Sequence, residues 1–140
     1  MVGRIQNEIP LIKINGHPEH RFYGNLNVSF KYLRSHELLA EISDKVAFSA
    51  GAACLDEPSY VLSALKVHKD YALGSVRIGV GRFTTQREVD YLIDLLVSAI
   101  HKLRKDNPLF LQELASLSSK KWIGNPIILA QAYAIPKYHN

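Results

Sequence analysis

The sequence predicts a fold of the α/β class, more closely an α+β arrangement in which helices pack on one face of a small antiparallel or mixed sheet. In two segments, residues 26–31 and 76–80, apolar and polar residues alternate as they do in half-buried strands. In residues 89–103 apolar residues recur at intervals of three and four, which indicates an amphipathic helix of about five turns. The chain has 140 residues, the size of one domain with its own hydrophobic core.

The first half of the chain is expected to contain three strands and one helix. Residues 11–14 form a strand that ends at Asn15-Gly16, a dipeptide that favours positive φ and turns the chain. After the alternating strand at 26–31, Ser35 is expected to cap a short helix with the apolar residues Leu38, Leu39 and Ile42. Residues 46–48 form a short strand that leads into a loop of small residues ending at Cys54.

The second half is expected to be mainly helical. Pro58 suits a first helical turn, and helical spacing follows in the apolar residues Tyr60, Val61, Ala64 and Leu65. His68-Lys69 falls in a polar segment and is interpreted as a solvated turn, not as a Schiff-base lysine. Thr85 and Glu88 form a capping box before the long helix. A further short helix is indicated by Leu109, Phe110 and Leu114.

Composition and charge exclude several classes of protein. The formal charge is +4, from 17 basic and 13 acidic residues, and the charges are too dispersed to predict nucleic-acid binding. The one cysteine cannot form an intramolecular disulfide and fits a reducing compartment. No apolar run approaches the length of a membrane span and no targeting signal is visible. We therefore expect a protein of the cytoplasm or the mitochondrial matrix.

Cys54 is the first candidate for chemistry, because a cysteine thiolate is a strong nucleophile. It follows Gly51-Ala52-Ala53 and precedes a turn-prone acidic stretch at 55–58. That composition predicts an exposed loop from which the thiol can meet another molecule. The alternative is a small buried hydrophobic side chain, the usual state of an isolated cysteine. Loop composition alone leaves both interpretations open.

Arg77 is the second candidate, since it lies on the polar side of the strand at 76–80. A guanidinium held on a strand can bind a carboxylate through two parallel hydrogen bonds, and the alternative is an ordinary surface ion pair. Arg82 is expected to be structural and to bond to loop carbonyls near the start of the long helix. His17 and His20 are close in sequence, but structural zinc needs four ligands, so no metal site is expected.

An ordered series of motifs carries a resemblance to a known family. The motifs are NLNVSF at residues 25–30, FSAGAAC at 48–54, EPSYVL at 57–62 and VRIGVGRFTT at 76–85. They resemble the pyridoxal-phosphate-dependent cysteine desulfurases that supply sulfur for iron–sulfur clusters, over residues 4–110. Related selenocysteine lyases share parts of the pattern, notably the Gly-Ala-Ala-Cys form of the loop.

The resemblance implies the small carboxy-terminal domain of fold-type I pyridoxal-phosphate enzymes. Residues 1–107 would form this desulfurase-like small domain, and residues 108–140 a C-terminal helix and a divergent irregular tail. The resemblance also implies that Cys54 takes sulfur from L-cysteine as a persulfide, with release of alanine, and that Arg77 binds the substrate carboxylate.

The resemblance further implies what the chain would need. The cofactor-binding large domain, which carries the lysine that holds the cofactor, is expected to be missing. Pyridoxal phosphate is therefore not expected to bind this chain alone. Expected partners are that large domain and an iron–sulfur scaffold protein or another sulfur acceptor, with no nucleic acid and no membrane.

Three departures from the family pattern keep other functions open. The loop after Cys54 is about three residues shorter than is typical, which reduces its reach. Residues 35–38 read SHEL where the family has GESL, and the tail beyond Trp122 does not match. The chain could be part of an enzyme, a non-catalytic persulfide relay, a protein-interaction module, or a selenocysteine lyase-like fragment.

Overall fold

The computed structural model describes residues 1–50 and 59–121. This part of the chain contains six helices and four strands. In chain order they are α1 (Val2–Glu8), β1 (Ile12–Ile14), β2 (Asn25–Phe30), α2 (Ser35–Ile42), β3 (Ser49–Ala50), α3 (Tyr60–Ala64), α4 (Lys69–Ala72), β4 (Ser75–Gly79), α5 (Gln86–Arg104) and α6 (Pro108–Lys121).

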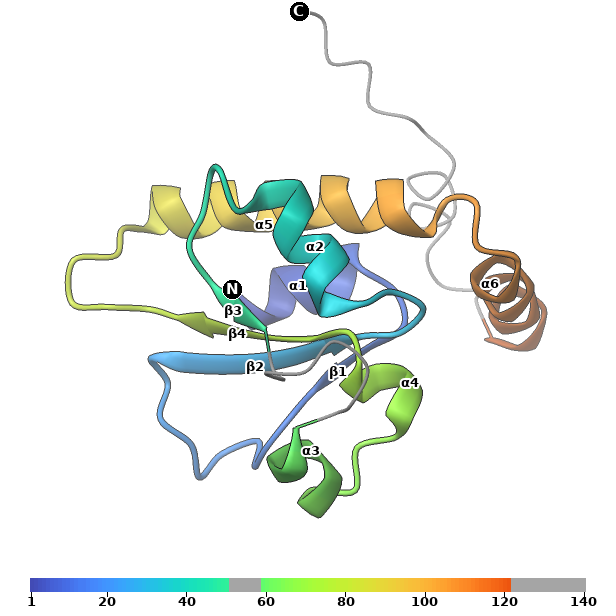
Figure 1. Ribbon diagram of the computed structural model, residues 1–140, viewed down its shortest axis with the longest axis horizontal. Helices are drawn as coiled ribbons and strands as arrows, with labels where there is room; N and C mark the ends of the chain where they lie inside the picture. Colours follow the sequence, from blue (N-terminus) through green and yellow to red (C-terminus); the bar gives the residue numbers. More distant parts are fainter. Residues whose placement is uncertain (51–58, 122–140) are drawn as a thin grey trace, which may run out of the picture.

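The strands form one antiparallel sheet in the order β1-β2-β4-β3 (Figure 1). Gly16, with φ of 91°, turns the chain after β1, as the Asn15-Gly16 dipeptide predicted. In the central pair, Leu26 lies opposite Ile78 and Asn27 lies opposite Arg77. Successive side chains point to opposite faces of a strand, so the two faces of this pair differ in polarity. The sheet and its helices confirm the predicted fold class.

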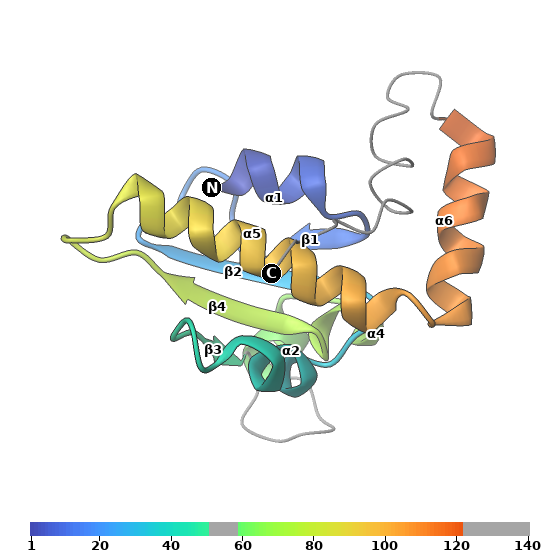
Figure 2. The same ribbon diagram turned by 90° about the horizontal axis from the view of Figure 1, so that it is seen from above.

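The core lies between one face of the sheet and the helices α1, α2 and α5 (Figure 2). Leu26, Val28 and Phe30 of β2 are fully buried, as their alternation predicted. α5 covers them with an apolar stripe made of Leu92, Ile93, Leu96, Ala99 and Ile100. Each large aliphatic side chain buried here contributes about 1.5–3 kcal/mol, so this contact between helix and sheet dominates the stability of the fold.

The short helices α3 and α4 lie on the opposite side of the sheet (Figure 1). The chain passes very close to β2 at Gly74, where an added Cβ would lie 2.0 Å from the carbonyl oxygen of Phe30. The Phe30 N–H in turn donates to the Gly74 carbonyl at 3.0 Å. Ser29 and Ser75 are consequently buried close to Gly74, whereas Arg77, two residues further along β4, is exposed.

The capping box predicted for the long helix is confirmed. Thr85 Oγ1 accepts the N–H of Glu88 at 3.3 Å, and Glu88 Oε2 accepts the N–H of Thr85 at 2.7 Å. The Thr85 N–H, and then the Thr85 hydroxyl at 2.9 Å, donate to the Glu88 carboxylate and hold its pKa below its usual value. The helix therefore begins where the sequence placed it.

The helix α1 was not predicted, because Ile5 is the one buried residue within its seven positions and no periodic pattern reveals it. It is joined to α5 by Arg4, whose Nη1 lies 2.9 Å from Asp90 Oδ1 and whose Nη2 lies 2.8 Å from Asp94 Oδ1. Arg4 Nε also pairs with Glu8 at 2.7 Å. Hydrogen bonds to these carboxylates, that of Glu8 first, raise the pKa of Arg4.

Three other local predictions need correction. Ser35 is the first residue of α2, not its cap; Arg34 is the cap, and the Glu37 carboxylate accepts its N–H at 3.2 Å. The strand placed at 46–48 is instead β3, where Ser49 pairs with Arg77. The polar segment at His68 begins α4, with His68 as the cap.

The predicted helix after Pro58 is confirmed as α3, but its orientation differs from the expected one. Tyr60, Val61 and Leu65 are exposed, and Leu62 is the residue that α3 buries. A five-residue helix is too short for its spacing to define which face is covered.

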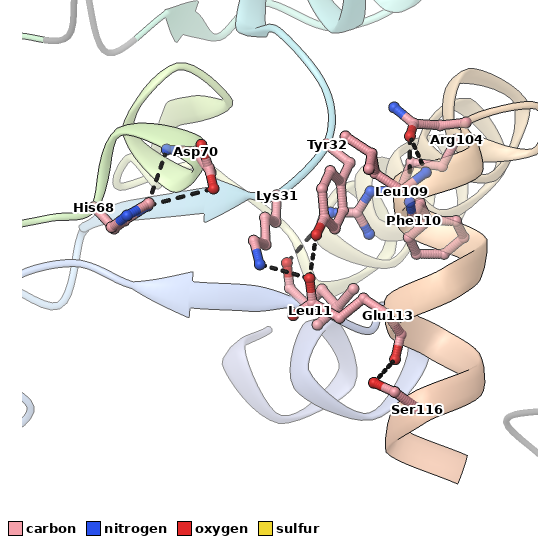
Figure 3. A network of polar contacts seen from close by, with 11 residues as sticks. Leu11, Lys31, Tyr32, His68, Asp70, Arg104, Leu109, Phe110, Glu113 and Ser116 are labelled. Atoms are coloured by element: carbon pink, nitrogen blue, oxygen red, sulfur yellow. Dashed lines mark hydrogen bonds and ion pairs between the residues drawn. The ribbon is translucent and has the colours of Figure 1, made fainter. Parts of the chain in front are cut away.

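A polar cluster attaches α6 to the end of β2 (Figure 3). The Glu113 carboxylate accepts from Lys31 Nζ at 2.6 Å and from the Tyr32 hydroxyl. The Glu113 hydrogen bond is the main reason why the pKa of Lys31 and that of Tyr32 are raised, and the pKa of Glu113 is lowered by the same bonds. Asn107 Oδ1 begins the helix by accepting the N–H of Leu109 at 3.0 Å.

Arg104 at the end of α5 is 1% exposed, although no carboxylate pairs with it among the described residues. Its Nη1 donates to the Pro10 carbonyl at 2.8 Å and its Nη2 to the Leu11 carbonyl at 3.3 Å. The guanidinium also lies 5.2 Å from the centre of the Phe110 ring (Figure 3). Burial lowers the pKa of Arg104.

The short helix predicted from Leu109, Phe110 and Leu114 is confirmed as α6, which begins at Pro108. The division of the chain into residues 1–107 and 108–140 stays a prediction, and the tail from residue 122 onward lies outside the described residues. Within residues 1–50 and 59–121, no helix is long and apolar enough to cross a membrane.

Candidate functional site

Arg77 lies at the centre of β4, on the open face of the sheet. It is flanked on both sides, because it pairs with Asn27 of β2 and with Ser49 of β3. The side chain is exposed and makes no ion pair or hydrogen bond with any residue in the described ranges. The ordinary surface ion pair considered for Arg77 is therefore not found there. The backbone is held by two neighbouring strands while the guanidinium is free to bind a ligand.

A groove with a volume of about 420 Å³ runs beside Arg77. Its charged or titratable lining residues are Arg21, Arg77, His17 and His20, and no carboxylate lines it within the described part of the chain. The remaining lining residues are Asn15, Gly16, Phe22, Asn25, Asn27, Ser59, Val61, Leu62 and Leu65. A groove with basic and amide groups and no acid suits an anionic ligand.

Two asparagines of this groove were not recognised from the sequence as site residues. Asn15 Nδ2 donates to Asn27 Oδ1 at 2.6 Å and to Ser29 Oγ at 2.7 Å. Asn27 lies on the polar side of an alternating strand, and this is the one sequence signal that could have identified it as a site residue. Asn15 carries no such signal, since the Asn15-Gly16 dipeptide predicts only a turn.

His17 and His20 are used to build the turn after β1. His17 Nδ1 accepts the N–H of Glu19 at 3.1 Å and the N–H of His20 at 2.9 Å, and the two rings lie 4.5 Å apart. His17 Nδ1 is thus occupied by the turn. Among the residues that the structure describes, no group of three or more His, Cys, Asp or Glu side chains could hold a metal ion.

Cys54 lies outside the described residues, so its predicted role stays a prediction. The described residues on either side of that segment both lie near Arg77. Ala50 ends β3 opposite Val76, and Ser59 lines the Arg77 groove and begins α3 by accepting the Val61 N–H at 3.3 Å.

Arg82 does not bond to loop carbonyls as expected. Its guanidinium lies 5.7 Å from the centre of the Phe83 ring and makes no hydrogen bond with any described residue. The loop is held instead by the Gly81 N–H, which donates to Thr84 Oγ1 at 3.0 Å. Arg82 and Phe83 line a separate groove of about 400 Å³ near the start of α5.

The Arg77 groove does not fit pyridoxal phosphate itself. An aldehyde cofactor bound as a Schiff base needs a lysine amine, and no lysine lines this groove in the part of the chain described. Among the described residues, the lining also has no carboxylate to hold a protonated pyridine nitrogen. The described lining therefore offers groups for an anion, not those that the cofactor needs.

Comparison with known proteins places this fold in context. The family described as Aminotransferase class-V has a sequence model that matches residues 1–92. The chain is 45% identical over 123 residues to "Probable cysteine desulfurase, mitochondrial" of Dictyostelium discoideum, covering 84% of this chain and 27% of that protein. It is 42% identical over 127 residues to "Cysteine desulfurase IscS" of Ehrlichia chaffeensis, covering 87% of this chain and 31% of that protein.

Solved structures show the same arrangement. One named "NIFS-LIKE PROTEIN" matches with a TM-score of 0.58 and 26% identity, over 69% of this chain and 24% of that chain. A NifS-like protein from Rickettsia africae matches with a TM-score of 0.56 and 16% identity, over 74% of this chain and 26% of that one, which supports the fold alone. The chain spans less than a third of the length of each of these relatives.

Proposed function

The chain belongs to the class-V aminotransferase family, and we propose that it is the part of a cysteine desulfurase that binds the substrate carboxylate and carries the sulfur-accepting cysteine. The observation that carries the proposal is the Arg77 guanidinium, which has no partner within residues 1–50 and 59–121 and lies in a groove whose charged lining residues, in those same ranges, are all basic. The proteins named cysteine desulfurase that resemble this chain support the same reading.

Arg77 binds the carboxylate of L-cysteine in this proposal. A guanidinium presents its donors in a planar fork that matches the two oxygens of a carboxylate. Because the Arg77 backbone is held between β2 and β3, the fork is presented from a rigid element. Such preorganisation reduces the entropy lost when the ligand binds.

Cys54 accepts the sulfur atom. Its thiolate attacks the sulfur of L-cysteine, the carbon–sulfur bond of the substrate breaks, and Cys54 becomes a persulfide. The freed carbon takes up a proton, so that alanine leaves and the overall reaction consumes no oxidant or reductant. The support from the described residues is that Ala50 and Ser59 border the segment containing Cys54 and both lie near Arg77: Ala50 directly follows Ser49, the strand partner of Arg77, and Ser59 lines the same groove.

Pyridoxal phosphate supplies the electron sink for this reaction when it is bound. We propose that the cofactor is held by a domain that corresponds to the part of the relatives outside their match to this chain, because no lysine in the described ranges lines the Arg77 groove. An iron–sulfur scaffold protein or another acceptor would then receive the persulfide sulfur.

The proposal is tested by following sulfur on Cys54. The reduced chain is incubated with L-cysteine and an active cysteine desulfurase, and its intact mass is measured. We expect the chain to gain the mass of one sulfur atom, and a Cys54→Ser variant to gain none. Equal gain by both proteins, or gain by neither, would contradict the role of Cys54.

A second experiment tests the division of labour. The chain alone is incubated with pyridoxal phosphate and L-cysteine, and cofactor absorbance and alanine are measured. We expect neither a cofactor spectrum nor alanine. Alanine production by the chain alone would overturn the proposal that the cofactor is held elsewhere. Cys54 could also gain sulfur from a separate desulfurase while no lysine-bearing domain is encoded next to this chain. That combination would instead favour a persulfide relay.

A further inference from the structure

Asn15 is a buried polar side chain that packing alone does not explain. It is 7% exposed, and its Nδ2 donates to Asn27 Oδ1 at 2.6 Å and to Ser29 Oγ at 2.7 Å. Both amide hydrogens are thus used, while the buried Asn15 Oδ1 has no partner among the described residues. An unpaired buried oxygen costs free energy, whereas the two bonds from Nδ2 give partners to Asn27 Oδ1 and to the buried Ser29 Oγ.

The bond from Asn15 sets the orientation of the Asn27 amide. Because Asn27 Oδ1 accepts from Asn15, the Asn27 Nδ2 group, on the other side of Cγ in the same plane, is directed away from Asn15. Asn27 lines the groove beside Arg77, and its Nδ2 bonds to no residue within 1–50 or 59–121. Two donor hydrogens are therefore left for a ligand in the groove.

Asn27 and Arg77 are direct partners across the central strand pair. Side chains placed directly opposite each other point from the same face, with Cβ atoms about 4.5–5.5 Å apart. A carboxylate has two oxygens that accept several hydrogen bonds between them. One carboxylate can therefore accept from the Arg77 guanidinium and from the Asn27 amide together.

We propose that Asn27 is a second carboxylate-binding residue of the groove, and that Asn15 is the positioning residue that keeps the Asn27 Nδ2 group toward the ligand. This inference rests on the proposed function, in which Arg77 binds the carboxylate of an α-amino acid. The Asn27 amide adds a neutral, directional hydrogen-bond donor to the Arg77 cation. The groove is thereby selective for a planar carboxylate and not for negative charge in general.

The role of Asn27 is tested by titrating the full, isotopically labelled chain and following its amide resonances. L-Alanine serves as an unreactive amino acid with the same α-carboxylate, and L-alaninamide as a probe that lacks the carboxylate. We expect saturable shifts at Arg77 and at the Asn27 side chain with L-alanine only. Asn27→Leu should weaken L-alanine binding about tenfold, the usual effect of losing one hydrogen bond to a charged group.

Asn25→Leu is the matched control, because Asn25 lies on the same strand and lines the same groove but pairs with Gly79. It should weaken L-alanine binding less than Asn27→Leu does, because Asn25 lies two positions along β2 from the residue that directly faces Arg77. Equal losses in Asn25→Leu and Asn27→Leu would overturn the inference, because the groove would then lack a specific second donor.

The positioning role of Asn15 has its own signature. Asn15→Asp cannot donate to Asn27 Oδ1, so the Asn27 amide turns over and presents its oxygen to the ligand. Asn15→Ala leaves that amide free to rotate. We expect L-alanine affinity to fall from the unchanged chain to Asn15→Ala and further to Asn15→Asp, with Asn25→Asp as the control for added negative charge. A purely structural role would lower thermal stability and leave the affinity of the folded chain unchanged.

The outcomes separate this inference from the proposed function. If the unchanged chain does not prefer L-alanine to L-alaninamide, the carboxylate site itself fails, and both ideas fail with it. If Arg77→Ala abolishes binding but Asn27→Leu binds as well as the unchanged chain, only the inference fails.

Discussion

Lys31 Nζ lies 2.6 Å from Glu113 Oε2, and this contact joins the end of β2 to α6 across 82 positions of sequence (Figure 3). The Tyr32 hydroxyl donates to the same carboxylate oxygen. The Lys31 side chain is 16% exposed, so the pair is shielded from water more than a typical surface ion pair. One carboxylate of α6 thus accepts from two residues that follow β2.

Replacing that carboxylate tests its contribution. Glu113→Gln should lower the free energy of unfolding by about 2 kcal/mol, because a charged acceptor is lost and Lys31 is left half-buried without a partner. Urea denaturation measures the change. Gln112→Ala, on an exposed position of the same helix, is the control and should change stability by less than about 0.5 kcal/mol. Equal losses in the two variants would mean that helix propensity, not the ion pair, holds α6.

The same contact should respond to acid. The folded pKa of Glu113 is lowered by Lys31 and then Tyr32, so its contribution is complete above the unfolded pKa of about 4.3. It is lost as the pH falls through the lower, folded pKa. We expect amide exchange in α6 to accelerate below about pH 4 in the unchanged chain, while α6 in Glu113→Gln shows no such transition. A transition shared by both chains would place the titrating group elsewhere.

Arg104 should tolerate an uncharged side chain of similar length better than a short one. Arg104→Ala should lower the free energy of unfolding by about 3 kcal/mol, because it removes packing against Phe110 and leaves the Pro10 carbonyl unpaired. Arg104→Met keeps the apolar stem and removes a buried cation that itself costs free energy, so its loss should be within about 1 kcal/mol.

Thermal and urea denaturation distinguish these two Arg104 variants. Lys105→Ala, at an exposed neighbouring position, serves as the control. If Arg104→Met were as unstable as Arg104→Ala, the carbonyl hydrogen bonds would outweigh the cost of burying the charge.

The close approach at Gly74 gives a prediction with a control on the same strand pair. An added Cβ at Gly74 would lie 2.0 Å from the Phe30 oxygen and 2.8 Å from the Leu33 oxygen, so backbone must move. Gly74→Ala should cost about 3 kcal/mol. Gly79→Ala meets no atom within 4 Å and should change stability by less than about 1 kcal/mol. Similar melting temperatures for both variants would contradict the close packing at Gly74.

The elements predicted correctly are those whose signal is local. The alternation around Leu26 and Ile78 and the capping box at Thr85 each depend on a few neighbouring residues, and the structure confirms them. Arg77 was singled out because alternation placed it on the polar side of its strand. These patterns work because burial of one face follows directly from the period of the element.

The features that the sequence did not reveal depend on contacts between distant segments. Arg104 looks like one more cation in a basic last turn, and its burial follows from carbonyls at Pro10 and Leu11 more than ninety positions earlier. Asn15 looks like a turn residue, yet it orients Asn27 on the next strand. Spacing along the chain carries no information about such pairings.

The strand order described above also has a consequence for how the chain folds. β2 meets β1 after a short connection, but its other partner is β4, where Leu26 faces Ile78 more than fifty positions later. Closing so long a loop costs entropy before the hydrogen bonds between β2 and β4 can form. Folding rates fall as contacts become less local. During synthesis, the first strand pair can therefore form early, while the apolar side of β2 must wait for β4 and α5 to emerge from the ribosome.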